Sequence, residues 1–386
     1  MKVRRQSYGQ KILNSFAAAI LGVIMFLASF AVLFWNEGRE NLAKAAGLAE
    51  DITDSASLDG VKEGKAVCVR GSLDATGYAA DEYLVSGDYI YIERTVEMYA
   101  YVEKVKTTEK DNFGGSSTII EEYSYELVWT DSPQKTDTFK GDVNEQPFSF
   151  DKTWYNNRID TKPENKRVKA SGLKIGPFSV DNDPEMSGAK RLELNQGNTK
   201  ILTLEQAALY ADYIYMGQNP ASPQPGDIRI SYKALRSSDK GILFGEAEEG
   251  KITKYKTKKG NELFRYFADA NSKNQAVDIL DKEHRVISWI LRIVGFLLMF
   301  IGLMAMSGPI TKFLSVIPVF AKISNFVFGI AAFIISLVLT ALTIALSILL
   351  HNFLWAMLIV AAIIAITITA AALKRKKATQ MAKAKR

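Results

Sequence analysis

The sequence has little cysteine and histidine, and this scarcity excludes several kinds of site. Among 386 residues there is one cysteine, Cys68, and there are two histidines, His284 and His351. A structural zinc site takes about four nitrogen or sulfur ligands, and a zinc-protease helix needs paired histidines. This chain can assemble neither, and a single cysteine forms no intrachain disulfide. We therefore expect no cofactor and no metal site.

Acidic residues are missing from both ends of the chain. All 42 aspartates and glutamates lie in the segment 36–285 together with 34 of the 48 lysines and arginines, which gives this segment a formal charge of −8. The remaining 136 residues contain 14 basic residues and no acid. Because this basic excess flanks apolar runs and does not form a basic domain, it indicates membrane topology and argues against nucleic-acid binding.

Four apolar runs are long enough to cross a bilayer, which takes about 20 helical residues. The expected membrane helices cover 16–35, 286–306, 326–350 and 353–373. We interpret the first as an uncleaved anchor, because its apolar core is longer than that of a typical signal peptide and no convincing A-x-A cleavage site follows it. The last two are separated by only two residues, so we expect them to form a helical hairpin.

Basic residues near the spans predict an orientation. They gather in the arm 1–15, the connection 307–325 and the tail 374–386. With four spans these regions share one side, and short basic segments mark the cytoplasmic side of a membrane. We therefore expect both termini in the cytoplasm and the segment 36–285 in the periplasm or a lumen, with the connection partly interfacial. A bacterial inner membrane is favoured, and a eukaryotic chain would lie in the endoplasmic reticulum or nuclear envelope.

Between 36 and 285, short alternating runs with turn signals are typical of a β-rich domain. The clearest expected strands are 66–73, 89–106, 119–129, 228–232, 242–246 and 251–256. The expected helices are 41–54, 204–213 and 274–284. The predicted fold class is an α+β membrane protein with four transmembrane helices. A large β-rich exoplasmic domain, as one domain or two subdomains, is inserted between the first and second.

Short motifs in a fixed order indicate a family. They are Asn36, Glu37, Gly38 and Arg39 after the first span; Arg94, Glu97, Met98 and Tyr99; Asn219 and Pro220; Gly226, Asp227 and Arg229; and His284 and Arg285 before the second span. Over nearly the whole chain they resemble the LUMA family, which comprises transmembrane protein 43 and its bacterial relatives. One departure is Tyr101, near the place where the family usually has a tryptophan.

The resemblance implies an integral membrane protein that self-associates and acts as a membrane-organising scaffold. Animal members of the family reside in the endoplasmic reticulum and inner nuclear membrane and are regarded as scaffolds for nuclear-envelope proteins. Bacterial members have no nuclear envelope, so the resemblance leaves the partner proteins of this chain open.

Charged residues at the membrane boundary are candidate contacts between the domain and the helices. They are Glu37, Arg39, His284, Arg285 and Arg292. If the first two spans pack together, we expect Glu37 to pair with Arg285 or Arg292 and to clamp the domain onto the helices. The plainer interpretations are that Gly38 stops the first helix and that Arg292 snorkels to the lipid headgroups.

Two glycines of the second span predict close helix packing. Gly295 and Gly302 lie seven residues apart, on one face of a helix. The lack of a side chain at both lets a neighbouring backbone approach closely. This spacing favours a helix bundle or an oligomer.

The sequence contains no established catalytic motif: no G-x-S-x-G, no Walker loop, and no histidine near Cys68. A pair of domain carboxylates acting as a hydrolase on envelope polymer is one alternative. The spans contain no acidic residue of the kind that coupled transporters place at the midplane. A passive oligomeric channel lined by hydroxyls such as Thr340 and Ser347 is the other alternative. We expect a non-catalytic scaffold that binds membrane lipids and forms homo-oligomers.

Overall fold

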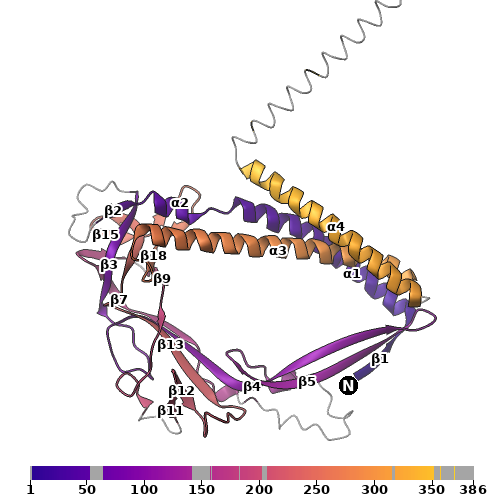
Figure 1. Cartoon of the computed structure of the whole chain (residues 1–386), viewed down its shortest axis with the longest axis horizontal. Helices are drawn as coiled ribbons and strands as arrows, with labels where there is room; N and C mark the ends of the chain where they lie inside the picture. Colours follow the sequence, from indigo (N-terminus) through magenta and orange to yellow (C-terminus); the bar gives the residue numbers. More distant parts are fainter. Residues whose placement is uncertain are drawn as a thin grey trace, which may run out of the picture. The chain divides into compact units, whose positions relative to one another are not determined.

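The computed structural model of the chain describes residues 2–52, 64–140, 157, 159–181, 183–201, 207–314 and 318–351, with positions 357 and 369. Apart from those two positions, the expected span 353–373 and the tail 374–386 lie outside the described residues. The chain divides into two compact units, whose elements Figure 1 labels. The β-rich unit comprises 1–5, 40–110 and 118–284, and the helical unit comprises 6–39, 111–117 and 285–386.

Three helices in the described part of the chain are long and apolar enough to cross a membrane. They are α1 (Tyr8–Gly38), α3 (Lys273–Leu314) and α4 (Pro318–His351). A capping box starts α1, in which the side chains of Ser7 and Gln10 each accept from the other's backbone N–H. The apolar runs expected at 16–35, 286–306 and 326–350 are thus confirmed as helices.

Within the helical unit, α1 and α4 run in the same direction and α3 runs against them (Figure 1). The end of α1 meets the end of α4, because a Cβ on Gly38 would collide with the ring of His351. The start of α1 meets the end of α3, where the Tyr8 hydroxyl donates to the carbonyl of Phe313 at 3.4 Å. Since α3 continues through Pro309 and α4 starts at Pro318, most of the connection expected at 307–325 is helical.

The first eight-stranded sheet begins with the N-terminal residues. Its spatial order is β1 (Lys2–Gln6), β5 (Ser117–Thr130), β4 (Tyr89–Asp111), β13 (Ile228–Arg236), β12 (Tyr213–Met216) and β11 (Ala207–Tyr210), with β6 (Lys166–Lys169) on β4 and β10 (Lys190–Arg191) on β13. From Ile92 to Ala100 every second residue of β4 is buried. One face of this sheet therefore lies in the core, and the other presents Glu93, Glu97 and Tyr99 outward.

The second eight-stranded sheet is shorter in most of its strands. Its order is β2 (Glu50–Ile52), β3 (Ala66–Gly77), β7 (Ser171–Ile175), β8 (Phe178–Val180), β15 (Lys251–Thr253), β14 (Lys240–Glu248), β18 (Arg265–Phe267) and β9 (Glu185–Ser187). A hairpin of β16 (Tyr255–Lys256) and β17 (Glu262–Leu263), the helix α2 (Leu42–Gly47) and the 3₁₀ turns Thr136–Thr138 and Ile159–Thr161 complete the described elements. The prediction of a large β-rich domain is confirmed.

Three expectations for local structure differ from the fold. The helix expected at 204–213 is wrong for its described residues 207–213, because β11 and β12 form an antiparallel hairpin there, with a positive φ of 51° at Ala211. The helix expected at 41–54 ends at Gly47, and β2 follows it. Residues 2–6, expected as part of the N-terminal arm 1–15, form the edge strand β1. In each case pairing with a neighbouring strand decides the structure, and a sequence window contains no information about that neighbour.

Candidate functional site

The motif residues 36–39 form a polar cluster where α1 ends. Asn36, 2% exposed, donates through Nδ2 to the carbonyl of Ser288 on α3 at 3.1 Å and to Glu37 at 3.2 Å. Glu37 accepts two hydrogen bonds of 2.8 Å from Nε and Nη2 of Arg292. Such a two-point carboxylate–guanidinium pair is geometrically specific. The cluster therefore fixes α1 against α3.

Aromatic rings complete the cluster. The guanidinium of Arg292 lies 5.2 Å from the ring centre of Trp289, and that of Arg39 lies 5.9 Å from the ring of Trp35. Both tryptophans are 62% exposed. Tryptophans and arginines of this kind are typical of the boundary between hydrocarbon and headgroups.

The expected partner of Glu37 is thus Arg292. Both residues belong to the helical unit, so the pair joins two helices, and a clamping role for the domain stays a prediction. Arg285 lies two turns before Arg292 on α3, and His284 is the last residue that the β-rich unit contributes to that helix.

Glycines allow α1 and α3 to touch. A Cβ on Gly302 would lie 2.8 Å from the carbonyl oxygen of Gly22, and one on Gly22 would lie 2.7 Å from that of Gly302. A Cβ on Gly295 would lie 2.5 Å from the side chain of Leu33. The sequence identified Gly295 and Gly302 but missed Gly22, although Gly22 is the one glycine of the first expected span.

Arg94 lies in a buried ion pair inside the β-rich unit. Its Nη1 is 3.0 Å from Oδ2 of Asp81, and the Tyr232 hydroxyl donates to the same carboxylate at 2.6 Å. Arg94, Asp81 and Tyr232 are 4%, 5% and 1% exposed. Burial, followed by the hydrogen bond to Asp81, raises the pKa of Tyr232. Asp81 and Tyr232 were not identified from the sequence, because no local pattern marks a pairing across 151 residues.

Glu97 and Arg229 face each other on β4 and β13. Nε of Arg229 lies 2.6 Å from Oε2 of Glu97, and its guanidinium lies 4.6 Å from the ring centre of Trp129 and 4.9 Å from that of Tyr213. A cation between two rings in this geometry is attracted by both. The motif residues thus tie β4, β5, β12 and β13 together on the outward face.

The second half of the motif forms the turn before β13. The carboxylate of Asp227 accepts from the Tyr215 hydroxyl and from the backbone N–H of Gln224. Gly226, with φ +95°, allows the turn and donates to the carbonyl of Tyr99 at 2.9 Å. Oδ1 of Asn219, which precedes Pro220, accepts a hydrogen bond from the backbone N–H of Ala221. Met98 on β4 is fully buried and lies opposite Ile228 on β13. These contacts hold the strand register.

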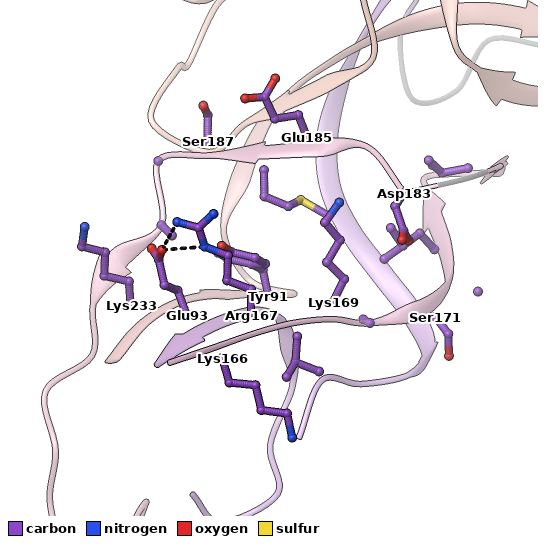
Figure 2. Close-up of a pocket in the computed structure, with 18 of the residues that line it drawn as sticks. Tyr91, Glu93, Lys166, Arg167, Lys169, Ser171, Asp183, Glu185, Ser187 and Lys233 are labelled. Carbon is purple, nitrogen blue, oxygen red and sulfur yellow. Dashed lines mark hydrogen bonds and ion pairs between the residues drawn. The ribbon is translucent and has the colours of Figure 1, made fainter. Parts of the chain in front are cut away.

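A cavity of about 1210 Å³ lies in the β-rich unit between β6 and β9 (Figure 2). Its charged lining residues are Glu93, Lys166, Arg167, Lys169, Asp181, Asp183, Glu185 and Lys233. Arg167 pairs with Glu93 at 2.8 Å, and Nζ of Lys169 donates to the carbonyl of Pro184 at 3.0 Å. No group of metal-ligating side chains occurs in the described residues. The cavity could hold a polar ligand, but the balance of charges favours no single class.

The thiol and the membrane hydroxyls are enclosed. Burial, and then the neighbouring Asp51, raise the pKa of Cys68 to about 12, so the thiol stays protonated at neutral pH. Oγ1 of Thr340 lies 3.7 Å from the sulfur of Met299, and the Ser347 hydroxyl donates to the carbonyl of Phe34 at 3.1 Å. These hydroxyls make helix contacts.

Comparisons with known proteins agree with this architecture. The family model for transmembrane protein 43 matches residues 98–353. Transmembrane protein 43 of Mus musculus is 26% identical over 374 residues, covering 91% of this chain and 88% of the mouse protein. The Homo sapiens protein is 25% identical over 370 residues with the same coverage, and a Drosophila melanogaster homolog is 23% identical, covering 77% of this chain and 78% of its own. No solved structure is significantly similar.

The family model spans more than half of the chain, and the relatives cover most of its length. The apolar helices and the β-rich domain agree with a membrane protein. The resemblance inferred from the motifs is therefore confirmed: the chain belongs to the transmembrane protein 43 family.

Proposed function

We propose that this chain is a non-catalytic membrane scaffold that self-associates and organises membrane proteins or lipids through its β-rich unit. The observation that supports this most directly is that the charged motif residues bond to one another. Glu37 pairs with Arg292 and Glu97 pairs with Arg229. A catalytic site needs at least one such group placed within reach of a substrate. Here these groups hold helices and strands in place.

Two further observations favour a scaffold over the alternatives. The protonated, buried thiol of Cys68 is unsuited to nucleophilic catalysis. A passive channel needs hydroxyls that face an aqueous path, whereas Thr340 and Ser347 are 8% and 1% exposed and contact neighbouring helices. The contacts of these two hydroxyls therefore support a role in helix packing.

A carboxylate-based hydrolase is the second candidate, and the cavity in Figure 2 is what favours it. Asp183 and Glu185 are two of the carboxylates that line this cavity. Glycan hydrolysis takes two carboxylates that flank the bond to be cleaved. The cavity is large enough for a sugar unit, since ligand pockets of about 300–1,000 Å³ hold small molecules.

The basic residues support a cytoplasmic N-terminal arm and tail, and the bacterial inner membrane is the location we propose. In such a membrane the nuclear-envelope partners of animal relatives are absent. The scaffold would then bind other copies of itself, membrane lipids or bacterial membrane proteins.

The test is to purify the full chain in lipid nanodiscs and to determine its stoichiometry by mass photometry and electron microscopy. The proposal expects a closed homo-oligomer without a continuous aqueous path. A monomer that cleaves cell-wall glycan would contradict it. In that case a variant with Asp183→Asn and Glu185→Gln should lose the cleavage, whereas the matched Asp239→Asn variant outside the cavity should keep it.

A further inference from the structure

Charged side chains protect five of the strands that end or flank the two eight-stranded sheets. An edge strand has backbone N–H and C=O groups that can pair with another chain, and charges on the strand hinder such pairing. The charged residues are Lys2, Arg4 and Arg5 on β1, Lys166, Arg167 and Lys169 on β6, Lys190 and Arg191 on β10, Glu50 and Asp51 on β2, and Glu185 on β9. These five edges are therefore unsuited to pairing with a further strand.

The edge strand β11 lacks this protection. Its sequence from Ala207 to Tyr210 is Ala-Ala-Leu-Tyr, with no charged residue and no proline. Within the described part of the chain it pairs with β12 alone. We call the side of β11 that faces away from β12 the open edge. An uncharged open edge of this kind is a template for a further strand.

The hairpin register shows which backbone groups lie at the open edge. Tyr210 and Tyr213 are opposite each other and close a two-residue turn. Such a pair exchanges both backbone hydrogen bonds, and bonded and non-bonded pairs alternate along an antiparallel ladder. Tyr210 and Ala208 therefore bond to β12. The N–H and C=O groups of Ala207 and Leu209 point to the open edge.

The core beside β11 is only partly covered. Ala207 and Leu209 pack against the buried cluster that includes Met98 and Ile214, yet both remain half-exposed. Ala208 and Tyr210 alternate with them and are exposed. A strand added at the open edge would extend the core and remove Ala207 and Leu209 from water, which is favourable.

We infer that β11 pairs with β11 of a second copy of this chain, antiparallel and about a twofold axis. The inference rests on the proposed self-association and names its interface. An axis at Ala208 places Ala207 of each copy opposite Leu209 of the other. Both opposing pairs then exchange two backbone hydrogen bonds, and their apolar side chains meet on the core face.

The symmetry and the membrane both favour a second copy as the occupant. The open edge is self-complementary, because one register satisfies the free groups of both strands and keeps Leu209 on the core face. A twofold contact of this kind closes at two copies. The ladder is short, but copies anchored in one bilayer by their apolar helices meet at a high effective concentration.

A cysteine at the proposed axis tests the pairing directly. In a Cys68→Ala background, Ala208→Cys would place two thiols in a non-hydrogen-bonded pair, whose Cα atoms lie about 4.5 Å apart. Disulfides take Cα distances of about 4.4–6.8 Å. The matched control is Tyr210→Cys on the same face, because the two copies of that position would lie four residues apart, or about 13 Å.

Mild oxidation of the full chain in intact membranes should cross-link Ala208→Cys into a dimer. The Tyr210→Cys control should form at least tenfold less dimer. Equal cross-linking of the two variants, or none of Ala208→Cys, would overturn the inference.

A charge swap at the same position provides an independent readout. Like charges directly opposite on paired strands repel, and opposite charges attract. Ala208→Lys and Ala208→Glu, each with its own affinity tag, should self-associate at least tenfold less than the unchanged chain, whereas a mixture should form mixed pairs. Leu48→Lys, at a position that is 88% exposed, should associate like the unchanged chain.

Recovery in the mixture also shows that both charged variants are folded. If the mixture associates no better than either variant alone, β11 is not the interface.

The stoichiometry in nanodiscs separates failure of this interface from failure of the proposed function. A homo-oligomer in which Ala208→Cys forms no disulfide overturns the inference and leaves self-association in place. A monomer overturns both. A disulfide from Ala208→Cys to a different protein would mean that β11 accepts a foreign strand, and it would equally overturn the inference.

Discussion

Arg229 joins three side chains on the outward face of the first sheet. Its guanidinium lies between Trp129 and Tyr213 and pairs with Glu97. Arg229→Lys retains the charge but loses the planar group that stacks on both rings. We expect the free energy of unfolding of the full chain to fall by about 1–2 kcal/mol.

The measurement is denaturant unfolding in detergent, followed by tryptophan fluorescence. Arg4→Lys is the matched control, because Arg4 is 63% exposed and lies 3.8 Å from its acidic partner. Exposed pairs contribute about 0–1 kcal/mol, so the control should be almost unchanged. Equal losses in the two variants would show that stacking by Arg229 contributes nothing.

The buried thiol of Cys68 should make the free energy of unfolding depend on pH in the alkaline range. Its thiol has an ordinary pKa of 9.0, which burial raises to about 12 in the fold. The unfolded chain therefore loses this proton first, and the stabilisation present below pH 9 is lost as the pH rises toward 12. The slope for one group is at most about 1.4 kcal/mol per pH unit.

Unfolding titrations between pH 8 and pH 11 measure this effect. The Cys68→Ala variant, which has no thiol, should show a smaller decline than the native chain. The native thiol should also resist maleimide at pH 8 until the chain is unfolded. Rapid labelling of the folded protein would contradict both expectations.

Glycines determine how closely the helices α1 and α3 can approach each other. Gly302→Ala would place a methyl group 2.8 Å from a backbone carbonyl, and overpacking of this kind costs about 1–3 kcal/mol. Gly329→Ala on α4 meets no atom within 4 Å and should instead stabilise its helix by about 0.5–1 kcal/mol. Thermal unfolding of both variants in one detergent checks the opposite signs.

The ion pair between Glu37 and Arg292 also belongs to these two helices. Glu37 is 7% exposed, so Arg292→Gln leaves a nearly buried carboxylate without its partner, and losing one member of a buried pair costs about 3–5 kcal/mol. We expect Glu37→Gln with Arg292→Gln to be less damaging than Arg292→Gln alone. A double-mutant cycle measures the coupling, and strictly additive losses would show that the pair does not couple the helices.

The whole molecule should unfold in two steps, because its two compact units have different surroundings. Water surrounds the β-rich unit, whereas lipid or detergent surrounds the apolar helices. Urea weakens the burial of apolar side chains in water, whereas apolar helices surrounded by lipid or detergent have little exposed backbone to solvate. Hydrogen exchange followed by mass spectrometry should show peptides of β4 and β13 exchanging at lower urea than peptides of α1 and α4. A single cooperative loss of protection in all four would contradict this.

Much of the fold was predictable from sequence because its signals are local. Apolar runs longer than 18 residues predicted three helices that the structure confirms. The alternation of apolar and polar residues predicted β4, β5 and β14 to within a few residues. The hairpin of β11 and β12 was mistaken for a helix, because the run from Leu204 to Tyr213 has helix-forming residues. Its strands form only because β12 pairs with β13.

For the motif residues of the candidate sites, too, local sequence could not predict which residues pair. Sequence order identified Glu97 and Arg229 as family residues, but their pairing across 132 positions depends on the register of β4 and β13. Sequence order also identified Glu37, with Arg285 and Arg292 as its two possible partners. The packing of α1 on α3 selects Arg292. Asp81 and Lys11 have no motif, and only burial shows that each needs an opposite charge.

Sequence alone determined that the chain has apolar helices and a large β-rich domain, and to which family it belongs. Hydropathy, alternation and motif order are properties that can be read from residues along the chain. Only the tertiary structure decided which charges neutralise each other and that the basic arm is a strand attached to a hairpin more than a hundred residues away. The physical reason is that pairing energies depend on distance in space. Charge counts along the chain do not record where a partner lies.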